Sequence, residues 1–471
     1  MKSWDLLIGG KWLSLKETFE VTNPATGDVI GSVPNGGKSE ARQAVDAAYE
    51  SLPSWQAKTA LERSELLLKW HQLINEEAAE IAKLMTIEQG KPLKEALGEV
   101  NYANSFISWY AEEGKRIYGE TIPASFPNKR ILVQKQPVGV VAAITPWNFP
   151  AAMITRKIAP ALAAGCTAVI KPAEQTPLTA LYLAKLAVRA GIPDGVINVV
   201  TGNPKEIGST WMSDERVRKI TFTGSTEIGK LLMRQAADTV KKVSLELGGH
   251  APFIVMNDAD LNLAVEGVVA SKFRNAGQTC VCANRIYVHE DIMNPFLAKF
   301  IEKVRDLSVG DGLKEGVEIG PLIDEDAITK VQDQIRDAKE KGASVLVGGD
   351  LISGLFYQPT VLAGVTDEMV CMNEETFGPL APVATFSKVE EVIKRANNSR
   401  FGLAAYLYTQ NLSHAIKMSE ALEYGIVGVN DGLPAVAQAP FGGFKESGLG
   451  REGGHHGIEE FLETKYISLG I

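Results

Sequence analysis

The sequence predicts an α/β protein with a parallel-sheet domain followed by a second α/β domain. At 471 residues the chain is long for a single hydrophobic core, so two domains are the default expectation. From Val138 onward short apolar strands alternate with helical segments, a rhythm that favours a parallel sheet with right-handed crossovers. A second alternation of the same kind begins near His250.

The N-terminal third combines short strands with helix. Strand-like pieces are expected near residues 6–12 and 29–33. Apolar residues then recur at helical spacing from Glu62 to Gly90, which predicts an amphipathic helix that Gly90-Lys91-Pro92 ends. A stripe of this kind is typical of structural packing, so we assign it no chemistry.

The middle of the chain predicts a parallel, nucleotide-binding sheet. Strands are expected at residues 139–144, 167–170, 196–200, 219–222 and 243–247, with helices at 151–164, 178–190, 205–212 and 227–237. Ligands bind beyond the carboxyl ends of such strands. The residues there are polar, aromatic or glycine where the strands before them are apolar: Trp147, Asn148, Lys171, Glu174, Gly202, Gly224, Ser225 and Glu246.

A second α/β portion follows, with a boundary inferred near Gly248-Gly249. Strands near residues 253–256 and 286–289 flank a helix over 263–273 that delivers Cys280. A helix over 295–307 comes next, and further strands are expected at 342–349, 361–362 and 380–386.

Composition restricts the partners and the compartment. A formal net charge of −9 lacks the basic footprint of nucleic-acid or anionic-membrane binding, so small molecules or proteins are the expected partners. The longest weakly polar run, residues 158–170, falls short of the roughly 20 residues that span a bilayer. The N-terminal apolar run is too short for a secretory signal, and four cysteines make a poor disulfide framework. We expect a cytoplasmic protein.

Cys280 is the candidate nucleophile. It ends the run Phe-Arg-Asn-Ala-Gly-Gln-Thr-Cys at 273–280, in which Gly277 and small polar residues leave the thiol accessible. A thiolate nucleophile needs such access and a stabilising environment, whereas a structural cysteine acts as a small hydrophobe. A zinc site from Cys280 and Cys282 is disfavoured because His289 alone lies near in sequence, so no metal is predicted.

Two other polar groups fit roles beside that thiol. Glu246 interrupts an apolar strand end, either as a satisfied structural charge or as a general base whose pKa a partly apolar cavity raises. Asn148 offers an amide between two prolines, which would preorganise it as an oxyanion donor.

Two segments suit a nucleotide. Residues 224–230 nearly spell the phosphate-binding loop of an NTPase, but Leu231 stands where a magnesium-binding Ser or Thr is needed, so that class is disfavoured. The helix N-terminus at Gly224 and Ser225 could still face a dinucleotide pyrophosphate. Lys171 and Glu174 are either a solvated loop pair or the holders of an adenosine ribose. In the second case Glu174 would repel a 2′-phosphate, which favours NAD over NADP.

Seven motifs together resemble the aldehyde dehydrogenase superfamily over nearly the whole chain, and they stand in family order. They are PWNFP at 146–150, KPAE at 171–174, FTGS at 222–225, LELGG at 245–249, GQTC at 277–280, ETFGP at 375–379 and PFGG at 440–443. The resemblance implies that an aldehyde is oxidised to an acid through a cysteine thiohemiacetal and thioester.

The resemblance also implies roles for named residues. Cys280 would be the nucleophile, Asn148 and the Cys280 N–H the oxyanion hole, and Glu246 the base for hydrolysis. Lys157 and Glu452 would be a proton-relaying pair. The NAD site, with NADP also possible, would be formed by Trp147, Lys171, Glu174, Gly224, Ser225, Leu247, Glu375 and Phe377.

The family's architecture implies a Rossmann-like NAD-binding domain over residues 1–114 and 137–247 and a catalytic domain over 248–455. Residues 115–136 and 456–471 would form an oligomerisation β element, so a homodimer or homotetramer is expected.

The substrate prediction comes from the succinate-semialdehyde dehydrogenase branch, which residues 153–157, 273–275 and 280–285 resemble. There Arg156 and Arg274 would clamp a distal carboxylate, and the alternative for either is a structural ion pair. The loop at 431–439 lacks the serine usual in that branch, which leaves glutarate semialdehyde or lactaldehyde open. Cys282 is either a packing residue or the partner of Cys280 in a redox-switch disulfide. A catalytically retired NAD-binding protein is the rival from another class.

Overall fold

The strand and helix alternation in the middle of the chain forms an eight-stranded sheet in the computed structural model, which describes residues 2–471. Its order is β24-β12-β11-β8-β9-β10-β2-β3. The parallel strands are β8 (Val140–Ile144), β9 (Thr167–Lys171), β10 (Ile197–Val199), β11 (Val217–Thr223) and β12 (Lys242–Glu246). The helices between them are α5 (Ala152–Ala164), α6 (Pro177–Arg189), α7 (Pro204–Ser213) and α8 (Thr226–Ala236). Every predicted element of this region is confirmed, with boundaries shifted by a few residues.

The strand order creates a switch point between β8 and β11. From β8 the chain adds β9 and β10 on one side, and it then crosses to add β11 and β12 on the other. Crossovers leave β8 and β11 in opposite directions, so the loops after these two strands part and leave a crevice. Those loops carry Asn148 and Gly224.

The edges of this sheet come from distant parts of the chain. The region near residues 6–12 is a hairpin of β2 (Leu6–Ile8) and β3 (Lys11–Leu13), because Gly9 and Gly10 both take positive φ. At the other edge β24 (Gly448–Leu449) pairs antiparallel with β12, next to Glu246. A separate small sheet joins β1 (Lys2–Ser3), β5 (Val29–Pro34) and β4 (Thr18–Thr22).

The N-terminal helices are α1 (Lys38–Gln56), α2 (Ala60–Glu76), α3 (Ala78–Gln89) and α4 (Leu93–Glu113). The prediction of one continuous helix over 62–90 is wrong, because Glu77 is non-helical and separates α2 from α3. The Glu77 carboxylate is turned toward α6, where it accepts a hydrogen bond from Tyr182 at 2.5 Å and pairs with Arg189. Gly90, with φ of 97°, ends α3 as predicted.

The second sheet has seven strands in the order β15-β18-β19-β14-β13-β21-β22, all parallel except β15. They are β13 (Ala251–Val255), β14 (Ala283–His289), β15 (Ser344–Val347), β18 (Thr360–Ala363), β19 (Leu380–Phe386), β21 (Ala404–Tyr408) and β22 (Ile426–Val429). Its helices are α9 (Leu261–Phe273), α10 (Met293–Arg305), α11 (Glu325–Glu340), α12 (Val389–Asn397) and α13 (Leu412–Ala421). Short elements complete this body: β16 (Leu351–Ser353), β17 (Phe356–Tyr357), β20 (Phe401–Gly402) and β23 (Phe444–Lys445).

Each sheet has its own buried core. Apolar residues fill both faces of the first sheet, with α2 to α6 on one side and α1, α7 and α8 on the other. A separate apolar cluster surrounds the second sheet. The predicted fold class, α/β with a parallel sheet in the first body, is therefore confirmed, and the structure adds that the second sheet is also mainly parallel. Among the described residues no helix is long and apolar enough to cross a bilayer.

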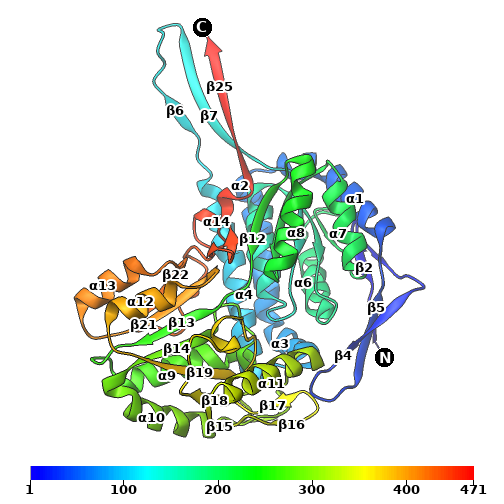
Figure 1. Ribbon diagram of the computed structural model, residues 1–471. Helices are drawn as coiled ribbons and strands as arrows, with labels where there is room; N and C mark the ends of the chain where they lie inside the picture. Colours follow the sequence, from blue (N-terminus) through cyan, green and yellow to red (C-terminus); the bar gives the residue numbers. More distant parts are fainter. Residues whose placement is uncertain (1) are drawn as a thin grey trace.

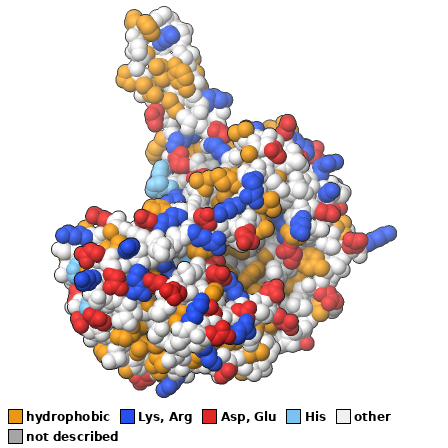
Figure 2. All heavy atoms as spheres, in the orientation of Figure 1, with side chains coloured by type: hydrophobic (Ala, Val, Ile, Leu, Met, Phe, Trp, Pro, Cys, Tyr) orange, Lys and Arg blue, Asp and Glu red, His pale blue; other side chains and the backbone are white. Residues whose placement is uncertain are grey.

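A β arm projects from these two bodies (Figure 1). It consists of β6 (Glu120–Ile122), β7 (Lys129–Pro137) and β25 (Leu462–Gly470), in the antiparallel order β25-β7-β6. The short helix α14 (His456–Glu459) leads into β25. Figure 2 shows apolar side chains gathered on the arm, and Phe126, Tyr466 and Ile471 are all exposed.

Candidate active site

Cys280 lies where two cavities meet. One cavity, of about 250 Å³, is lined by Tyr102, Phe149, Arg156 and Arg274 among others. The other, of about 320 Å³, is bordered by the loops at the switch point and by α11. The Cys280 side chain borders both. A thiol in this place can react with a molecule in the first cavity while a second ligand lies in the other.

The backbone before Cys280 is held in an uncommon conformation. After α9 ends at Phe273, the residues Asn275, Ala276 and Gly277 all have positive φ, at 51°, 54° and 75°. Two of them are not glycine, so neighbouring contacts must hold this turn. Gly249 also sets the position of Cys280, because a Cβ atom there would lie 1.9 Å from the Cys280 carbonyl oxygen.

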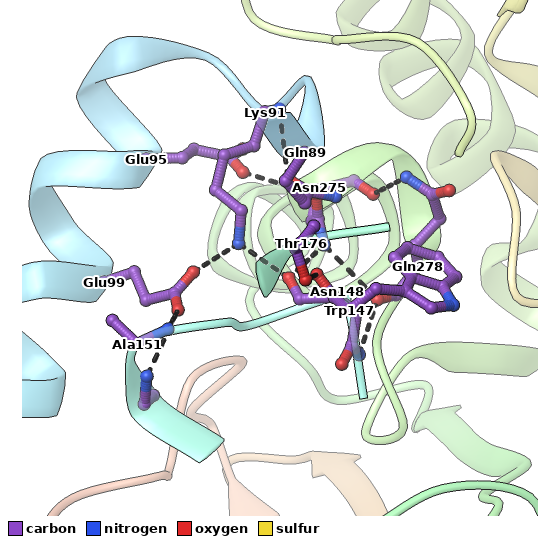
Figure 3. A network of polar contacts seen from close by, with 11 residues as sticks. Gln89, Lys91, Glu95, Glu99, Trp147, Asn148, Ala151, Thr176, Asn275 and Gln278 are labelled. Atoms are coloured by element: carbon purple, nitrogen blue, oxygen red, sulfur yellow. Dashed lines mark hydrogen bonds and ion pairs between the residues drawn. The ribbon is translucent and has the colours of Figure 1, made fainter. Parts of the chain in front are cut away.

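Asn148 presents its amide at the carboxyl end of β8. Its Nδ2 donates to the Gln278 carbonyl at 3.0 Å, which ties it to the Cys280 loop, and Asn148 lines the larger cavity beside Cys280. Nδ2 carries two protons and this bond uses one of them. The structure thus brings the predicted oxyanion donor to the same cavity as the predicted nucleophile, and Figure 3 shows the Asn148 side chain beside Gln278 of the Cys280 loop.

Glu246, at the end of β12, is buried near these groups but borders neither cavity. Its Oε2 has no hydrogen-bond partner among the described residues. Burial, and then the negative charge of Glu452, raise the pKa of Glu246 well above its ordinary value. A carboxyl group with a raised pKa is a stronger base than an ordinary carboxylate.

Glu452 joins two buried cations of α5. It forms an ion pair with Lys157, and Arg156 Nε donates to its Oε2 at 2.7 Å. Lys157 also donates to Thr223 Oγ1 at 2.5 Å. Burial opposes ionisation of Glu452, but Lys157 and Arg156 outweigh it and hold its pKa near 2. The predicted Lys157–Glu452 pair is present, and it includes a third member.

The two predicted substrate arginines differ in their surroundings. Arg156 is already neutralised by Glu452, and its guanidinium lies 4.1 Å from the centre of the Phe441 ring. Arg274 has no carboxylate within ion-pair distance among residues 2–471, and its Nε is buried without a hydrogen-bond partner. Both line the smaller cavity. The structural ion pair, one of the two predicted alternatives, therefore applies to Arg156, whereas Arg274 is free to bind an anion.

The larger cavity has the features that a dinucleotide needs. The residues Trp147, Gly224, Ser225, Leu247, Glu375 and Phe377 all line it, as predicted. Ser225 caps α8, whose first amides favour phosphate. Glu375 Oε1 accepts from the Gly249 amide at 2.8 Å, and burial raises the pKa of Glu375 to about 7.

Three residues at the strand ends lie outside that cavity. Lys171 and Glu174 form an ion pair of 2.6 Å, and Glu174 lines a neighbouring cavity of about 250 Å³ that shares Ile323 with the larger one. Gly202 packs against Gly36. The rule that ligands bind beyond strand ends therefore selects, at this position, a glycine that serves packing.

The structure does not support the alternative that this protein is an NTPase. Lys230, which would be its phosphate-binding lysine, forms an exposed ion pair of 2.6 Å with Glu446. Among residues 2–471 no group of three His, Cys, Asp or Glu is arranged to hold a metal ion.

The protein's own groups do not ionise the Cys280 thiol. The site desolvates the sulfur, and this effect, opposed by Arg156, raises the pKa of Cys280 to about 12. Cys282 points elsewhere: its Sγ accepts a hydrogen bond from the buried Lys272 at 3.2 Å. Both thiols are free, and the disulfide stays a prediction.

Sequence reasoning missed the residues that hold this site. Lys91, Glu99, Asn275 and Gln278 are buried and bond to the Asn148 and Cys280 loops. A Lys-Pro step before a helix and a carboxylate on a buried helix face were the available signals, but neither identifies a distant partner.

The fold and this site define an α/β enzyme with a cysteine nucleophile beside a dinucleotide-sized cavity. Residues 12–467 match the aldehyde dehydrogenase family, and the chain belongs to it. It is 58% identical to succinate-semialdehyde dehydrogenase [NADP(+)] of Escherichia coli K12, over 99% of this chain and 97% of that protein. It is 57% identical to glutarate-semialdehyde dehydrogenase of Pseudomonas putida, over 98% and 97% of the two chains. A crystal structure of succinate-semialdehyde dehydrogenase from Burkholderia pseudomallei is similar with a TM-score of 0.98 and 53% identity, over 99% and 98% of the chains.

Proposed function

We propose that this protein oxidises succinate semialdehyde, or a similar aldehyde with a distal carboxylate, to the acid with NAD or NADP. The observation that carries this is the unpaired guanidinium of Arg274 in the same cavity as the Cys280 thiol. A half-buried cation without a carboxylate partner favours an anionic ligand, and the planar guanidinium matches a carboxylate. The names of the relatives, which act on succinate or glutarate semialdehyde, agree with this choice.

In this mechanism Cys280 adds to the aldehyde carbon and its proton leaves. The resulting oxyanion of the thiohemiacetal is stabilised by Asn148 Nδ2 and by the Cys280 backbone N–H. A bound nicotinamide supplies the hydride acceptor. Loss of the hydride from the thiohemiacetal carbon leaves a thioester on Cys280, and water hydrolyses it to the acid and the free thiol.

Glu246 is the proposed base for that water. Its raised pKa suits the role, but its carboxylate borders neither cavity in the observed position and must turn toward Cys280. Gly442 leaves room for the carboxylate in its observed position, because a Cβ there would lie 3.0 Å from Glu246 Oε1. We propose that Lys157 and Glu452, the ion pair behind it, relay the proton that Glu246 takes from the water.

The cofactor is proposed to lie in the larger cavity, with its phosphates at α8 and a ribose at Glu375. Its adenosine end would reach the Lys171–Glu174 pair. A carboxylate there disfavours a 2′-phosphate, whereas a neighbouring lysine attracts it, so both NAD and NADP are proposed substrates. The proposed NAD-binding domain comprises residues 1–114 and 137–247, and the proposed catalytic domain comprises 248–455.

The β arm is proposed to join subunits into a homodimer or homotetramer. A three-stranded sheet needs one covered apolar face to be stable. Phe126 and Tyr466 are about three-fifths exposed on the arm, at 60% and 62%. A second copy of the chain would cover them. We propose that the assembly is cytoplasmic.

The substrate proposal is tested by steady-state kinetics of Arg274→Gln with succinate semialdehyde and with butanal, an uncharged aldehyde of the same chain length. Loss of a charge-assisted carboxylate contact costs about 2–3 kcal/mol, so kcat/KM for the charged aldehyde should fall about 30- to 150-fold. The value for butanal should change less than threefold by the same reasoning, since roughly 0.6 kcal/mol corresponds to that factor.

The matched control is Arg305→Gln, which removes an exposed arginine of α10. Equal losses on both aldehydes for Arg274→Gln would reject the carboxylate contact. Assay of glutarate semialdehyde in parallel tells which chain length the cavity accepts better.

A further inference from the structure

Lys91 is a buried cation outside the roles assigned so far. It follows Gly90 in the turn between α3 and α4, and its side chain is only 1% exposed. Lysine is seldom fully buried, and the loss of hydration costs several kcal/mol per ion unless the group is paired and hydrogen-bonded. Contacts that offset this cost must therefore fix the ammonium in place.

The ammonium of Lys91 has three partners in three directions. It forms an ion pair with Glu99, donates to the Asn148 carbonyl oxygen at 2.8 Å, and lies 4.0 Å from the centre of the Phe149 ring. An ammonium has three donors, and each faces one of these groups. Figure 3 shows Lys91 between the Glu99 carboxylate and the loop that carries Asn148.

Glu99 extends this hold to the start of α5. Its Oε1 accepts from the amides of Ala151 at 2.9 Å and Ala152 at 3.2 Å. These amides have no partner within α5, and a carboxylate at a helix N-terminus is favourable. Lys91 and Glu99 together thus bind the carbonyl of residue 148 and the amides three and four residues later, which fixes the whole loop.

The Asn148 carbonyl is also where the nucleophile loop is attached. Asn275 Nδ2 donates to it at 3.0 Å, alongside Lys91. Asn275 is the first of the three residues with positive φ that lead to Cys280. Its own amide donates to Glu95 on α4 at 2.8 Å, and its Oδ1 accepts from Gln89 on α3 at 3.0 Å. The turn between α3 and α4 therefore holds both loops.

We propose that Lys91 is a positioning residue that fixes the Asn148 amide relative to the Cys280 sulfur, and so sets the oxyanion hole. This inference rests on the proposed function and deepens it. Without the ammonium, the Asn148 carbonyl loses its charged donor and the peptide at 148–149 can rotate. The amide of Asn148 is on the same residue, so it leaves the place where the oxyanion forms.

Lys91 also lines the smaller cavity, so its alternative role is to bind the substrate carboxylate directly. A lysine that binds the substrate carboxylate directly would discriminate between charged and uncharged aldehydes. A positioning lysine acts on the carbonyl oxygen, which all aldehydes share. The same substrate pair used for Arg274 therefore separates the two roles.

The experiment uses the full chain and measures kcat and KM for succinate semialdehyde and butanal. Lys91→Met keeps a long, unbranched side chain without the ammonium, and Lys91→Met/Glu99→Gln also avoids an unpaired buried carboxylate while retaining an acceptor for Ala151. Loss of one oxyanion donor costs about a hundredfold or more in kcat, so both variants should lose about that factor on both aldehydes with KM little changed. Lys94→Met, which removes an exposed lysine in the first turn of α4, is the matched control and should retain wild-type rates.

A double-mutant cycle with Asn148→Ala tests the path of the effect. If Lys91 acts through the Asn148 amide, Lys91→Met should slow Asn148→Ala less than threefold, since groups that act as a unit are non-additive. A hundredfold loss in both backgrounds, or a loss confined to succinate semialdehyde, would overturn the proposal. Butanal carries no carboxylate, so the result for Lys91 stays decisive even if succinate semialdehyde is not the substrate of this protein.

Discussion

The Cys280 thiol should react slowly with an alkylating agent, and the rate of alkylation should keep rising with pH over an unusually wide range. Burial raises its pKa to about 12, compared with about 8.5 for a free cysteine. At about pH 7.5 a free cysteine is roughly 9% thiolate, whereas a thiol of pKa about 12 is roughly 0.003% thiolate. The ratio is about 3,000.

Part of this difference is compensated by intrinsic nucleophilicity. A thiolate becomes more nucleophilic as its pKa rises, with a Brønsted coefficient of about 0.45, which returns a factor of roughly 40 over about 3.5 pH units. The net expectation is alkylation about 80-fold slower than for an exposed cysteine at about pH 7.5.

The assay is the loss of dehydrogenase activity in iodoacetamide, followed from about pH 6.5 to about pH 9.5. The pKa is raised, so the thiol stays protonated throughout, and the rate should rise about tenfold for each pH unit without a plateau. Cys282→Ala is the control, because its buried sulfur should not contribute to the measured rate. A plateau below about pH 8.5 would falsify the assigned environment of Cys280.

Three further outcomes follow from single contacts. Glu452→Gln leaves two buried cations unpaired, so the free energy of unfolding should fall by roughly 3 kcal/mol at about pH 7, from a shift of about 2.5 pKa units. Because the pKa of the Glu452 carboxyl is depressed, the difference in unfolding free energy between wild type and variant should shrink as pH falls from about 4.5 toward about 2. Urea unfolding that gives the same difference at every pH would contradict this. Gly249→Ala should lower kcat about a hundredfold or more, because the new Cβ would displace the Cys280 carbonyl. Gly208→Ala is the control and should be neutral, because no atom lies within 4 Å of its new Cβ. Equal rates for the two variants would refute the close contact. Tyr466→Asp should lower the mass measured by light scattering, and an unchanged mass would argue against the arm as the interface.

The nucleotide-binding half of the fold follows from the sequence because its signals are local. Each strand there is short, apolar and followed by a turn residue, and a parallel sheet brings all strand ends to one edge. Trp147, Asn148, Gly224 and Ser225 meet at the switch point for this reason. The same rule selected Gly202, because a glycine after a strand serves close packing as readily as ligand binding.

The features that the sequence could not supply are contacts between distant residues. The helix expected at 62–90 breaks because Glu77 bonds to α6, more than a hundred residues away, while the apolar stripe continues across the break. For Arg156 the sequence predicts either a substrate contact or an ion pair, and the ion-pair partner, Glu452, lies 296 positions further along the chain. Lys91 belongs to the turn predicted to end a helix, and nothing local indicates that its ammonium reaches Asn148.

The strand β24 has a consequence for biosynthesis. It pairs beside Glu246 on β12, yet its residues emerge from the ribosome about two hundred positions later. Glu452 follows it directly, and β25 completes the arm after that. The edge strand of the first sheet, the carboxylate that pairs with two buried cations and the last arm strand are therefore made after the other residues of the site. A nascent chain cannot finish its active site before Glu452 has been made, so products truncated before that residue carry no mature catalytic centre.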